Sequence, residues 1–415
     1  MNYISCFECV ECKTQYPSDQ AMNLCPKDGR PVQMRLDIDN IAQDYPQLSW
    51  YDQAQKSMWR FGPLMPFDIH KYPDKICSLG EGNTPLVNVT DYGMFDSSFA
   101  HVFIKDEGQP YRGYGANPTG SFKDRGMSVV ATMAKHYGLH KLVVPTQGNA
   151  GDSLSEYGHQ FGLQVAVVMP DDTPMPIMGK VAAYSFKYPH ITLDLVKGTI
   201  REAGALMKQK YLPQGYFNCA TFQEPGWRIE GKKTMGLELA APNEMKDDWS
   251  LPDVIFYPTG GGTGILGMWK AFDELERLGI IDDKRPKIIA VQSQQNAPVV
   301  DALEKQLSDT QPTDGGDTLA TGLNVPGGVG HKAVLAIINQ SKGGGVAVSE
   351  AQISQHTRGI FQQYGMWISP EGAAAIAAVE QAKTLGLVKE SDQIVCFNTG
   401  SAEKYLPNIR HLFMS

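Results

Sequence analysis

A single lysine ends a run of turn-forming residues in the stretch GANPTGSFKDRG, residues 115–126. Lys123 stands directly before a helical pattern, and lysine does chemistry either as a neutral base or as an amine that forms a Schiff base. The helix dipole and the nearby Arg125 both disfavour a second positive charge, which lowers the cost of a neutral amine or an imine. Lys123 is therefore a candidate for covalent chemistry. The simpler alternative is a surface lysine before a helix that Ser121 caps.

A glycine-rich loop follows the apolar stretch VIFYP and leads into an amphipathic helix; it contains Gly260, Gly261, Gly262, Thr263 and Gly264. Glycines let main-chain N–H groups converge on an anion, and the helix N-terminus adds partial positive charge. No Lys-Ser or Lys-Thr follows the glycines, and the next strand pattern ends in Gln292 and Ser293 rather than in a ribose-binding acid. We expect a phosphate group without a nucleotide; the alternative is a tight, flexible turn.

Two more stretches of small polar residues follow apolar strand patterns. The loop at residues 145–151 offers Asn149 as a donor to a ring oxygen and main-chain amides for a carboxylate, and Thr399 directly follows the stretch IVCFN. An ordinary asparagine-glycine turn and a helix cap are the alternatives. A lysine amine, a phosphate loop, an asparagine and a hydroxyl together fit pyridoxal phosphate. Because Thr399 would be a neutral partner for the ring nitrogen, the pattern favours elimination and replacement chemistry over transamination.

The elements that must position these residues alternate regularly beyond about residue 73. Six nearly continuous apolar runs predict buried strands, beginning at Lys141, Gln164, Ile191, Val254, Lys287 and Ile394. Helical patterns lie between them, at residues 152–161, 199–210, 265–278 and 371–385. This alternation predicts an α/β fold with mostly parallel sheets, which bind ligands at the carboxyl ends of their strands. We expect a long surface loop at residues 309–322 and a turn at residues 341–348.

The order of the motifs is similar to that of fold-type II pyridoxal-phosphate enzymes, and the threonine synthase family is the closest match. The similarity runs from Ser78 to about Tyr405 and rests on LGEGNTPL, NPTGSFKDRG, TQGNAG, PTGGGTG, SPEGAAA and NTGSAEKY. It implies a tryptophan synthase β-like fold: two parallel-sheet α/β domains with an N-terminal ribbon-like extension. We expect the extension to cover residues 1–73 and the catalytic region residues 74–415, with the smaller subdomain inserted at about 117–225.

The resemblance also implies roles for individual residues. Lys123 resembles the Schiff-base lysine, Phe122 would pack near the ring, and Asn149 would bond the ring oxygen. The glycine loop resembles the phosphate site, and Thr399 resembles the ring-nitrogen partner. The loop that takes the substrate carboxylate would be formed by Thr146, Gln147 and Gly148. Gln147 departs from the small hydroxyl residue often found there, and a larger amide would narrow or re-aim that pocket.

A threonine synthase would convert O-phospho-L-homoserine and water to L-threonine and phosphate, with Lys123 moving protons along the substrate. The departing phosphate needs cations, for which the candidates are Lys180, Arg228 and Lys232; charge on a solvated helix face is the alternative. Other readings are a threonine or serine deaminase, a β-replacing enzyme such as cysteate synthase, and a non-catalytic sensor that binds the cofactor.

The N-terminal cysteines have the spacing of a zinc ribbon with one replaced ligand. Cys9 and Cys12 form one C-x-x-C pair, and Cys25 is followed three residues later by Asp28, although Cys6 could substitute as the fourth ligand. Zinc accepts a carboxylate, so three cysteines and an aspartate could bind it. The alternative is a ribbon that has lost its metal.

Composition limits the partners of this 415-residue chain. The formal net charge of −8 argues against nucleic acid or an anionic membrane. No apolar run reaches the roughly 20 residues that span a bilayer, and no signal peptide is visible at the start. Isolated cysteines in apolar stretches fit a reduced, cytoplasmic protein. We expect a small-molecule amino-acid substrate and, by resemblance, a homodimer.

Overall fold

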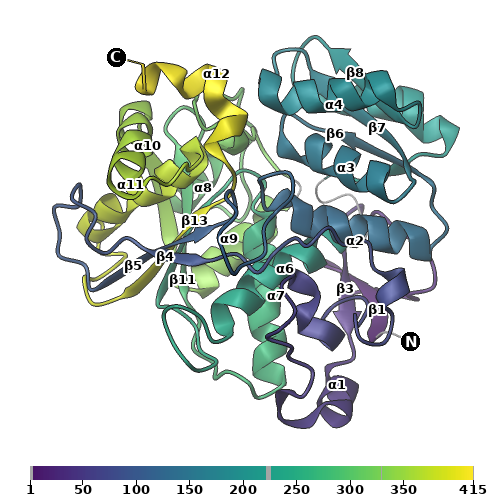
Figure 1. Ribbon diagram of the computed structural model, residues 1–415, viewed down its shortest axis with the longest axis horizontal. Coiled ribbons are helices and arrows are strands. Elements are labelled where there is room, and N and C mark those ends of the chain that lie inside the picture. The colour runs from purple at the N-terminus through teal and green to yellow at the C-terminus, as the bar shows by residue number, and fades with distance from the viewer. Residues whose placement is uncertain (1–2, 221–225, 329, 415) are drawn as a thin grey trace. The chain divides into compact units, whose positions relative to one another are not determined.

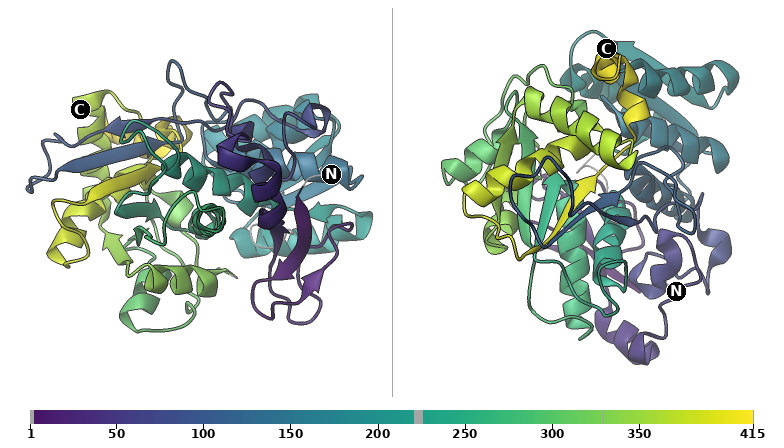
Figure 2. Two further views of the ribbon diagram at one scale, coloured as in Figure 1. Left: turned by 90° about the horizontal axis from the view of Figure 1, so that it is seen from below. Right: turned by 60° about the vertical axis from the view of Figure 1, so that its left-hand side comes forward.

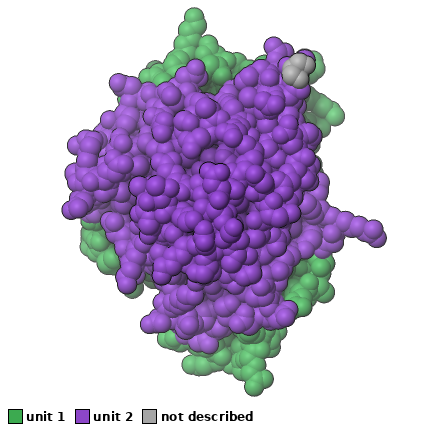
Figure 3. Space-filling view, turned by 90° about the vertical axis from the view of Figure 1, so that its left-hand side faces the viewer, with its two compact units in different colours: residues 1–83, 117–119, 123–234 green, residues 84–116, 120–122, 235–415 purple. Residues whose placement is uncertain are grey.

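The computed structural model describes residues 3–220, 226–328 and 330–414. The chain divides into two compact units, shown in different colours in Figure 3. Unit 1 comprises residues 1–83, 117–119 and 123–234, and unit 2 comprises residues 84–116, 120–122 and 235–415. The sequence-based boundary near residue 225 falls within residues 221–225, outside the described part of the chain.

Unit 1 contains a four-stranded parallel sheet in the order β8 (Ile191–Val196), β7 (Gln164–Pro170), β6 (Lys141–Pro145), β9 (Phe217–Asn218). Four helices accompany it: α2 (Lys123–His136), α3 (Asn149–Gln160), α4 (Met175–Lys187) and α5 (Ile200–Leu206), the last continued by a π-helical turn at Met207–Tyr211. Figure 1 shows α3 and α4 beside this sheet. Helix α3 starts three residues earlier than predicted, so Asn149 is its first residue.

An antiparallel ribbon at the N-terminus also belongs to unit 1. Its strands are β1 (Ile4–Cys9), β2 (Gln15–Tyr16) and β3 (Val32–Leu36), in the order β2-β1-β3, and α1 (Ile38–Asp44) follows (Figure 2, in purple). The segment after it is tied to α2, because the buried Trp59 indole donates to Ser128 Oγ (3.1 Å) and to Glu81 Oε1 (2.9 Å). The N-terminal segment thus packs on the helix that begins at Lys123.

Unit 2 contains a six-stranded sheet. Its order is β12 (Gly344–Val348), β11 (Lys287–Ser293), β10 (Val254–Pro258), β13 (Gln393–Asn398), β5 (His101–Asp106), β4 (Leu86–Asn88), and all neighbours are parallel except β4 and β5. Its helices are α7 (Thr263–Arg277), α8 (Pro298–Glu304), α9 (His331–Gln340), α10 (Glu350–Tyr364), α11 (Pro370–Thr384) and α12 (Leu406–Ile409). Helix α6 (Trp227–Ala240) contributes residues to both units.

Both faces of the large sheet are covered. Helix α11 packs along β10, β11, β12 and β13, and α10 packs on α11 (Figure 1). Val346 of β12 lies in the core formed with α11, whereas a Cβ at the adjacent Gly345 would meet Val300 and Leu303 at 3.0 Å, from α8 and the other face. Burial on both faces explains the continuous apolar runs in these strands. The α/β fold with parallel sheets and all six predicted strands are confirmed.

One prediction about the fold is wrong, and the sequence analysis did not predict several strands and 3₁₀ turns of the structure. Residues 341–348 are not only a turn, because Gly344–Val348 forms the edge strand β12 beside β11. The glycines of this segment favoured a turn over a strand, but close packing requires them: a Cβ at Gly345 would crowd α8, and a Cβ at Gly344 would crowd Leu387. The loop at 309–322 is irregular as predicted up to a 3₁₀ turn at Thr321–Leu323. Further 3₁₀ turns lie at Pro46–Leu48, Met58–Leu64, Pro73–Lys75, Leu212–Gln214, Ala402–Tyr405 and Arg410–Leu412.

Candidate active site

The glycine loop and Thr399 lie at the same edge of the sheet in unit 2. Strands β10 and β13 are parallel neighbours, with Val254 opposite Ile394 and Phe256 opposite Cys396. The loop leaves the carboxyl end of β10, and Thr399 directly follows β13. Carboxyl ends of parallel strands are where α/β sheets bind ligands, so the register alone brings these two motifs together.

Three of the glycines are required by close packing within unit 2. A Cβ at Gly260 would overlap the carbonyl oxygen of Gly322, and a Cβ at Gly264 would overlap the ring of Tyr257. Gly262 has a φ of +71° and lies against Val334. The loop can therefore turn directly into α7, whose N-terminus has no side-chain cap. The first N–H groups of a helix have no partner within it, so this end can receive an anion.

Two buried side chains to which the sequence analysis gave no role lie around this loop: His331 contacts Gly260 directly, and Glu371 contacts Gly322, which packs against Gly260. His331 Nε2 lies 2.9 Å from the Gly260 carbonyl oxygen, while its Nδ1 accepts from the N–H of Gly328 at 3.1 Å, so the proton is on Nε2. Burial lowers the pKa of His331 and keeps the ring neutral. Glu371 Oε1 accepts from the N–H of Gly322 at 2.7 Å, and burial raises the pKa of that carboxyl. The motif SPEGAAA contains Glu371, but no sequence pattern pointed to His331.

The residues just before Lys123 are joined to the end of β13. Ser121 forms a β-bridge with Gly400, and the N–H of Phe122 donates to the Thr399 carbonyl at 3.2 Å. The Phe122 ring meets Tyr257 edge-on, with ring centroids 6.4 Å apart. Ser121 Oγ is fully buried and has no hydrogen-bond partner among the described residues. Helix α2 begins at Lys123, so the alternative in which Ser121 caps this helix is wrong.

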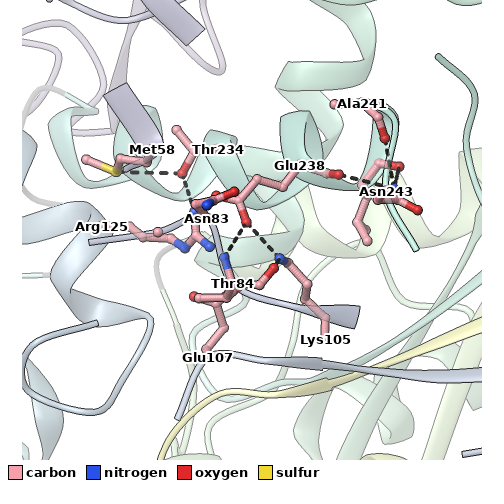
Figure 4. A network of polar contacts seen from close by, with 12 residues as sticks. Met58, Asn83, Thr84, Lys105, Glu107, Arg125, Thr234, Glu238, Ala241 and Asn243 are labelled. Atoms are coloured by element: carbon pink, nitrogen blue, oxygen red, sulfur yellow. Dashed lines mark hydrogen bonds and ion pairs between the residues drawn. The ribbon is translucent and has the colours of Figure 1, made fainter. Parts of the chain in front are cut away.

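In unit 1, Asp124 fixes the start of α2 against α3. Its carboxylate accepts from the N–H and Oγ1 of Thr119, both at 2.7 Å, and from Ser153 Oγ at 2.5 Å. Ser153 lies one turn beyond Asn149, the first residue of α3. Arg125, also buried, donates to Thr234 Oγ1 at 2.9 Å (Figure 4). The half-buried Lys123 and Asn149 are thus the first residues of two helices that one buried carboxylate holds together.

The predicted carboxylate loop precedes α3. Thr146 is buried and its hydroxyl accepts from the Gly148 N–H at 3.0 Å, whereas Gln147 is half-buried. Gly148 is the N-cap of α3 and supplies no side-chain cap, so this N-terminus also suits an anion.

The three candidate cations differ in their surroundings. Lys180 pairs with Asp152 (3.3 Å) and Glu156 (2.9 Å) of α3; although burial lowers the pKa of Lys180, these carboxylates raise it overall. Arg228 and Lys232 of α6 are buried, and Arg228 donates to the Cys219 carbonyl at 3.0 Å. The alternative of charge on a solvated helix face is therefore wrong for Arg228 and Lys232.

These features fit pyridoxal phosphate. Helices α7 and α3 begin without side-chain caps, in contrast to α10 and α11, which Ser349 and Ser369 cap. The buried Ser121 hydroxyl, which lacks a partner in the described ranges, lies beside the Thr399 segment. A bound anion would accept hydrogen bonds from the N–H groups of an uncapped helix N-terminus, and a polar ring would offer a hydrogen-bond partner to the Ser121 hydroxyl.

The comparison with known families indicates the same cofactor. A family model described as pyridoxal-phosphate dependent enzyme matches residues 77–400, and the chain belongs to this family. Its fold is that of the fold-type II enzymes, and its cofactor is pyridoxal phosphate.

Among curated relatives, the chain resembles threonine synthases. It is 28% identical to that of Methanocaldococcus jannaschii over 402 residues, covering 95% of this chain and 92% of the relative. It is 27% identical to that of Methanosarcina acetivorans over 393 residues, covering 95% and 90%. Among solved structures, a threonine deaminase isoform of Solanum lycopersicum superimposes with a TM-score of 0.63 at 22% identity, covering 80% of this chain and 88% of that one. No described helix has the length and apolar character to cross a membrane.

Proposed function

We propose that this enzyme is a threonine synthase, which converts O-phospho-L-homoserine and water to L-threonine and phosphate. The observation that carries the proposal is the similarity to threonine synthases over 95% of the chain, including the N-terminal segment. The deaminase and racemase structures share the fold at 22% identity or less and so do not indicate the substrate.

The proposed roles of the residues follow their positions. Pyridoxal phosphate, when bound, supplies the electron sink that stabilises negative charge on the substrate. Residues 260–264 and the start of α7 would bind its phosphate, Asn149 and Thr399 would hold the ring, and Phe122 would pack beside it. Lys123 would hold the cofactor and then move the proton at the substrate α-carbon.

Thr146, Gln147 and Gly148 would bind the substrate carboxylate at the start of α3. Lys180, Arg228 and Lys232 are the proposed cations for the phosphate of the substrate. Because the ion pairs of Lys180 with Asp152 and Glu156 hold its charge, it stays protonated at neutral pH.

A panel of four substrates tests the reaction: O-phospho-L-homoserine, L-threonine, L-serine and O-phospho-L-serine. The proposal predicts inorganic phosphate and L-threonine from the first compound and little turnover of the others. Ammonia and a 2-oxo acid formed from L-threonine would instead identify a deaminase. Phosphate released from O-phospho-L-serine only when a nucleophile such as sulfite is added, with the nucleophile bonded to the β-carbon of the product, would identify a β-replacing enzyme.

Lys123→Ala tests the role of the lysine. We expect loss of turnover and of the visible absorption of the bound cofactor, with an unchanged circular dichroism spectrum. Lys135→Ala is the matched control, because Lys135 lies exposed in the last turn of the same helix. Equal loss of activity in both variants would remove Lys123 from the chemistry.

We further propose a cytoplasmic homodimer in which residues 74–415 carry catalysis and residues 1–73 form an extension. Light scattering of the purified protein, at concentrations spanning those of the activity assay, measures the oligomeric state.

A further inference from the structure

We propose that the N-terminal ribbon binds one zinc ion through Cys9, Cys12, Cys25 and Asp28. One ligand atom from each residue, a thiol sulfur or a carboxylate oxygen, lies within 4.8 Å of all the others. Cys6, the alternative fourth ligand from the sequence, is not part of this group among the described residues. The fold thus selects Asp28 over Cys6.

The four residues come from two turns that the ribbon brings together. Cys9 ends β1 and Cys12 lies in the turn after it, while Cys25 and Asp28 lie in the turn before β3. Pairing of Cys9 with Val32 in the β1–β3 ladder sets the two turns side by side. Cys12 Sγ and Cys25 Sγ are 3.7 Å apart. Two thiolates on a tetrahedral zinc at about 2.3 Å would be separated by about 3.8 Å, whereas a disulfide requires about 2.0 Å.

Neighbouring donors are arranged to stabilise thiolates. Cys9 Sγ accepts from the main-chain N–H groups of Glu11 and Cys12, each at 3.4 Å. The Tyr16 hydroxyl lies 3.0 Å from Cys25 Sγ, and Asp28 Oδ1 accepts from the N–H of Arg30 at 3.0 Å. Such outer contacts orient metal ligands and hold them in their charged form.

The donor set points to zinc and to a structural role. Three sulfurs disfavour calcium and magnesium, which prefer oxygen ligands, and four protein ligands leave no open position for catalysis. The site would tie the turn after β1 to the turn before β3. The N-terminal segment also contacts the residue that follows α2, because the Tyr137 hydroxyl donates to the Ser18 carbonyl at 2.7 Å. Zinc binding is therefore expected to stabilise unit 1 as well as the ribbon.

The test uses the full-length protein, purified in reducing buffer without chelators. Elemental analysis should find one zinc ion per chain, and cobalt substitution should give the intense visible bands of tetrahedral cobalt with sulfur ligands. Cys12→Ser and Asp28→Ala, both at exposed positions, should lower zinc affinity by more than the about 10- to 100-fold loss typical of an outer contact. Asp28→Cys should raise the affinity, measured by competition with a chromophoric chelator.

Cys6→Ser is the matched control and should bind zinc like the wild type. Absence of zinc and of cobalt bands in the wild type would overturn the proposal, as would wild-type affinity in both ligand variants, or equal loss in Cys6→Ser. The readouts are metal content, spectrum and affinity, so their outcome is independent of which amino acid the enzyme converts.

Discussion

The imidazole Nε2 of His331 lies 2.9 Å from the carbonyl oxygen of Gly260, the first glycine of the loop after β10. The two residues are 71 positions apart in sequence, and both are buried. Since the neutral ring accepts at Nδ1 and donates at Nε2, it joins the glycine loop to the loop that carries Gly328. His331 therefore positions the glycine loop of the proposed phosphate site, and we propose no direct contact between His331 and the cofactor.

Replacing His331 by leucine should weaken cofactor binding. The Gly260 carbonyl would lose a buried partner, at a cost of about 1–3 kcal/mol, which corresponds to at least about a fivefold loss in affinity if it all acts on the loop. Titration of cofactor-free protein with pyridoxal phosphate measures the effect. His331→Gln keeps a donor and should recover part of it. Wild-type affinity in His331→Leu would show that the loop does not depend on this bond.

Gly260→Ala should lower cofactor content and activity. The new methyl group would overlap the Gly322 carbonyl oxygen, so the main chain at Gly260 or at Gly322 must move to admit it. Gly204→Ala is the control, because a Cβ there has no heavy atom within 4 Å, and alanine should favour helix α5 by about 0.5–1 kcal/mol. Cofactor absorbance per chain and thermal midpoints of both variants test this contrast. Full cofactor content in Gly260→Ala would contradict it.

The ion pair between Lys105 and Glu238 should be costly to break from one side. Lys105 Nζ lies 2.7 Å from Glu238 Oε2, and both side chains are about 2% exposed (Figure 4). Thr84, in the EGNTPL motif, donates its N–H to the same carboxylate at 3.2 Å and accepts from Lys105 with its carbonyl. Glu238→Leu should lower the unfolding free energy by about 3–5 kcal/mol, because a buried charge loses its partner.

The double variant Lys105→Met, Glu238→Leu should be more stable than Glu238→Leu alone, because it leaves no unpaired charge. Denaturant unfolding of both single variants and the double variant measures the coupling. Strictly additive losses would indicate that the two side chains stabilise unit 2 independently.

His356 should make unit 2 sensitive to acid. It lies in the core beside Tyr92, and burial lowers its pKa to about 4, opposed only in part by Glu380. Since the folded-state pKa lies below the usual value near 6.5, the folded state resists protonation. Stability is therefore fully present above about pH 6.5 and is lost as the pH falls toward 4, by up to about 3 kcal/mol.

His356→Leu should flatten this part of the pH dependence, as measured by denaturant unfolding between pH 7 and pH 4.5. His411→Gln, at an exposed position, should retain the wild-type slope. An unchanged slope in His356→Leu would assign the acid sensitivity to other groups.

The sequence by itself determined the motifs whose chemistry is local. The lysine motif before a helix (Lys123) and the glycine loop after a strand (Gly260) can each be recognised from a few adjacent residues, because turns, caps and buried strands depend on neighbouring residues. The alternation of these elements also determined the α/β class and placed the carboxyl ends of the strands at the binding edge.

Only the tertiary structure decided which distant residues support these motifs. His331 reached Gly260, Asp124 joined α2 to α3 through Ser153, and Asp28 rather than Cys6 completed the cysteine group. Strand β12 likewise depends on its place beside β11. Contacts between residues far apart in the chain arise from packing of whole elements, and no local pattern of residue types encodes them.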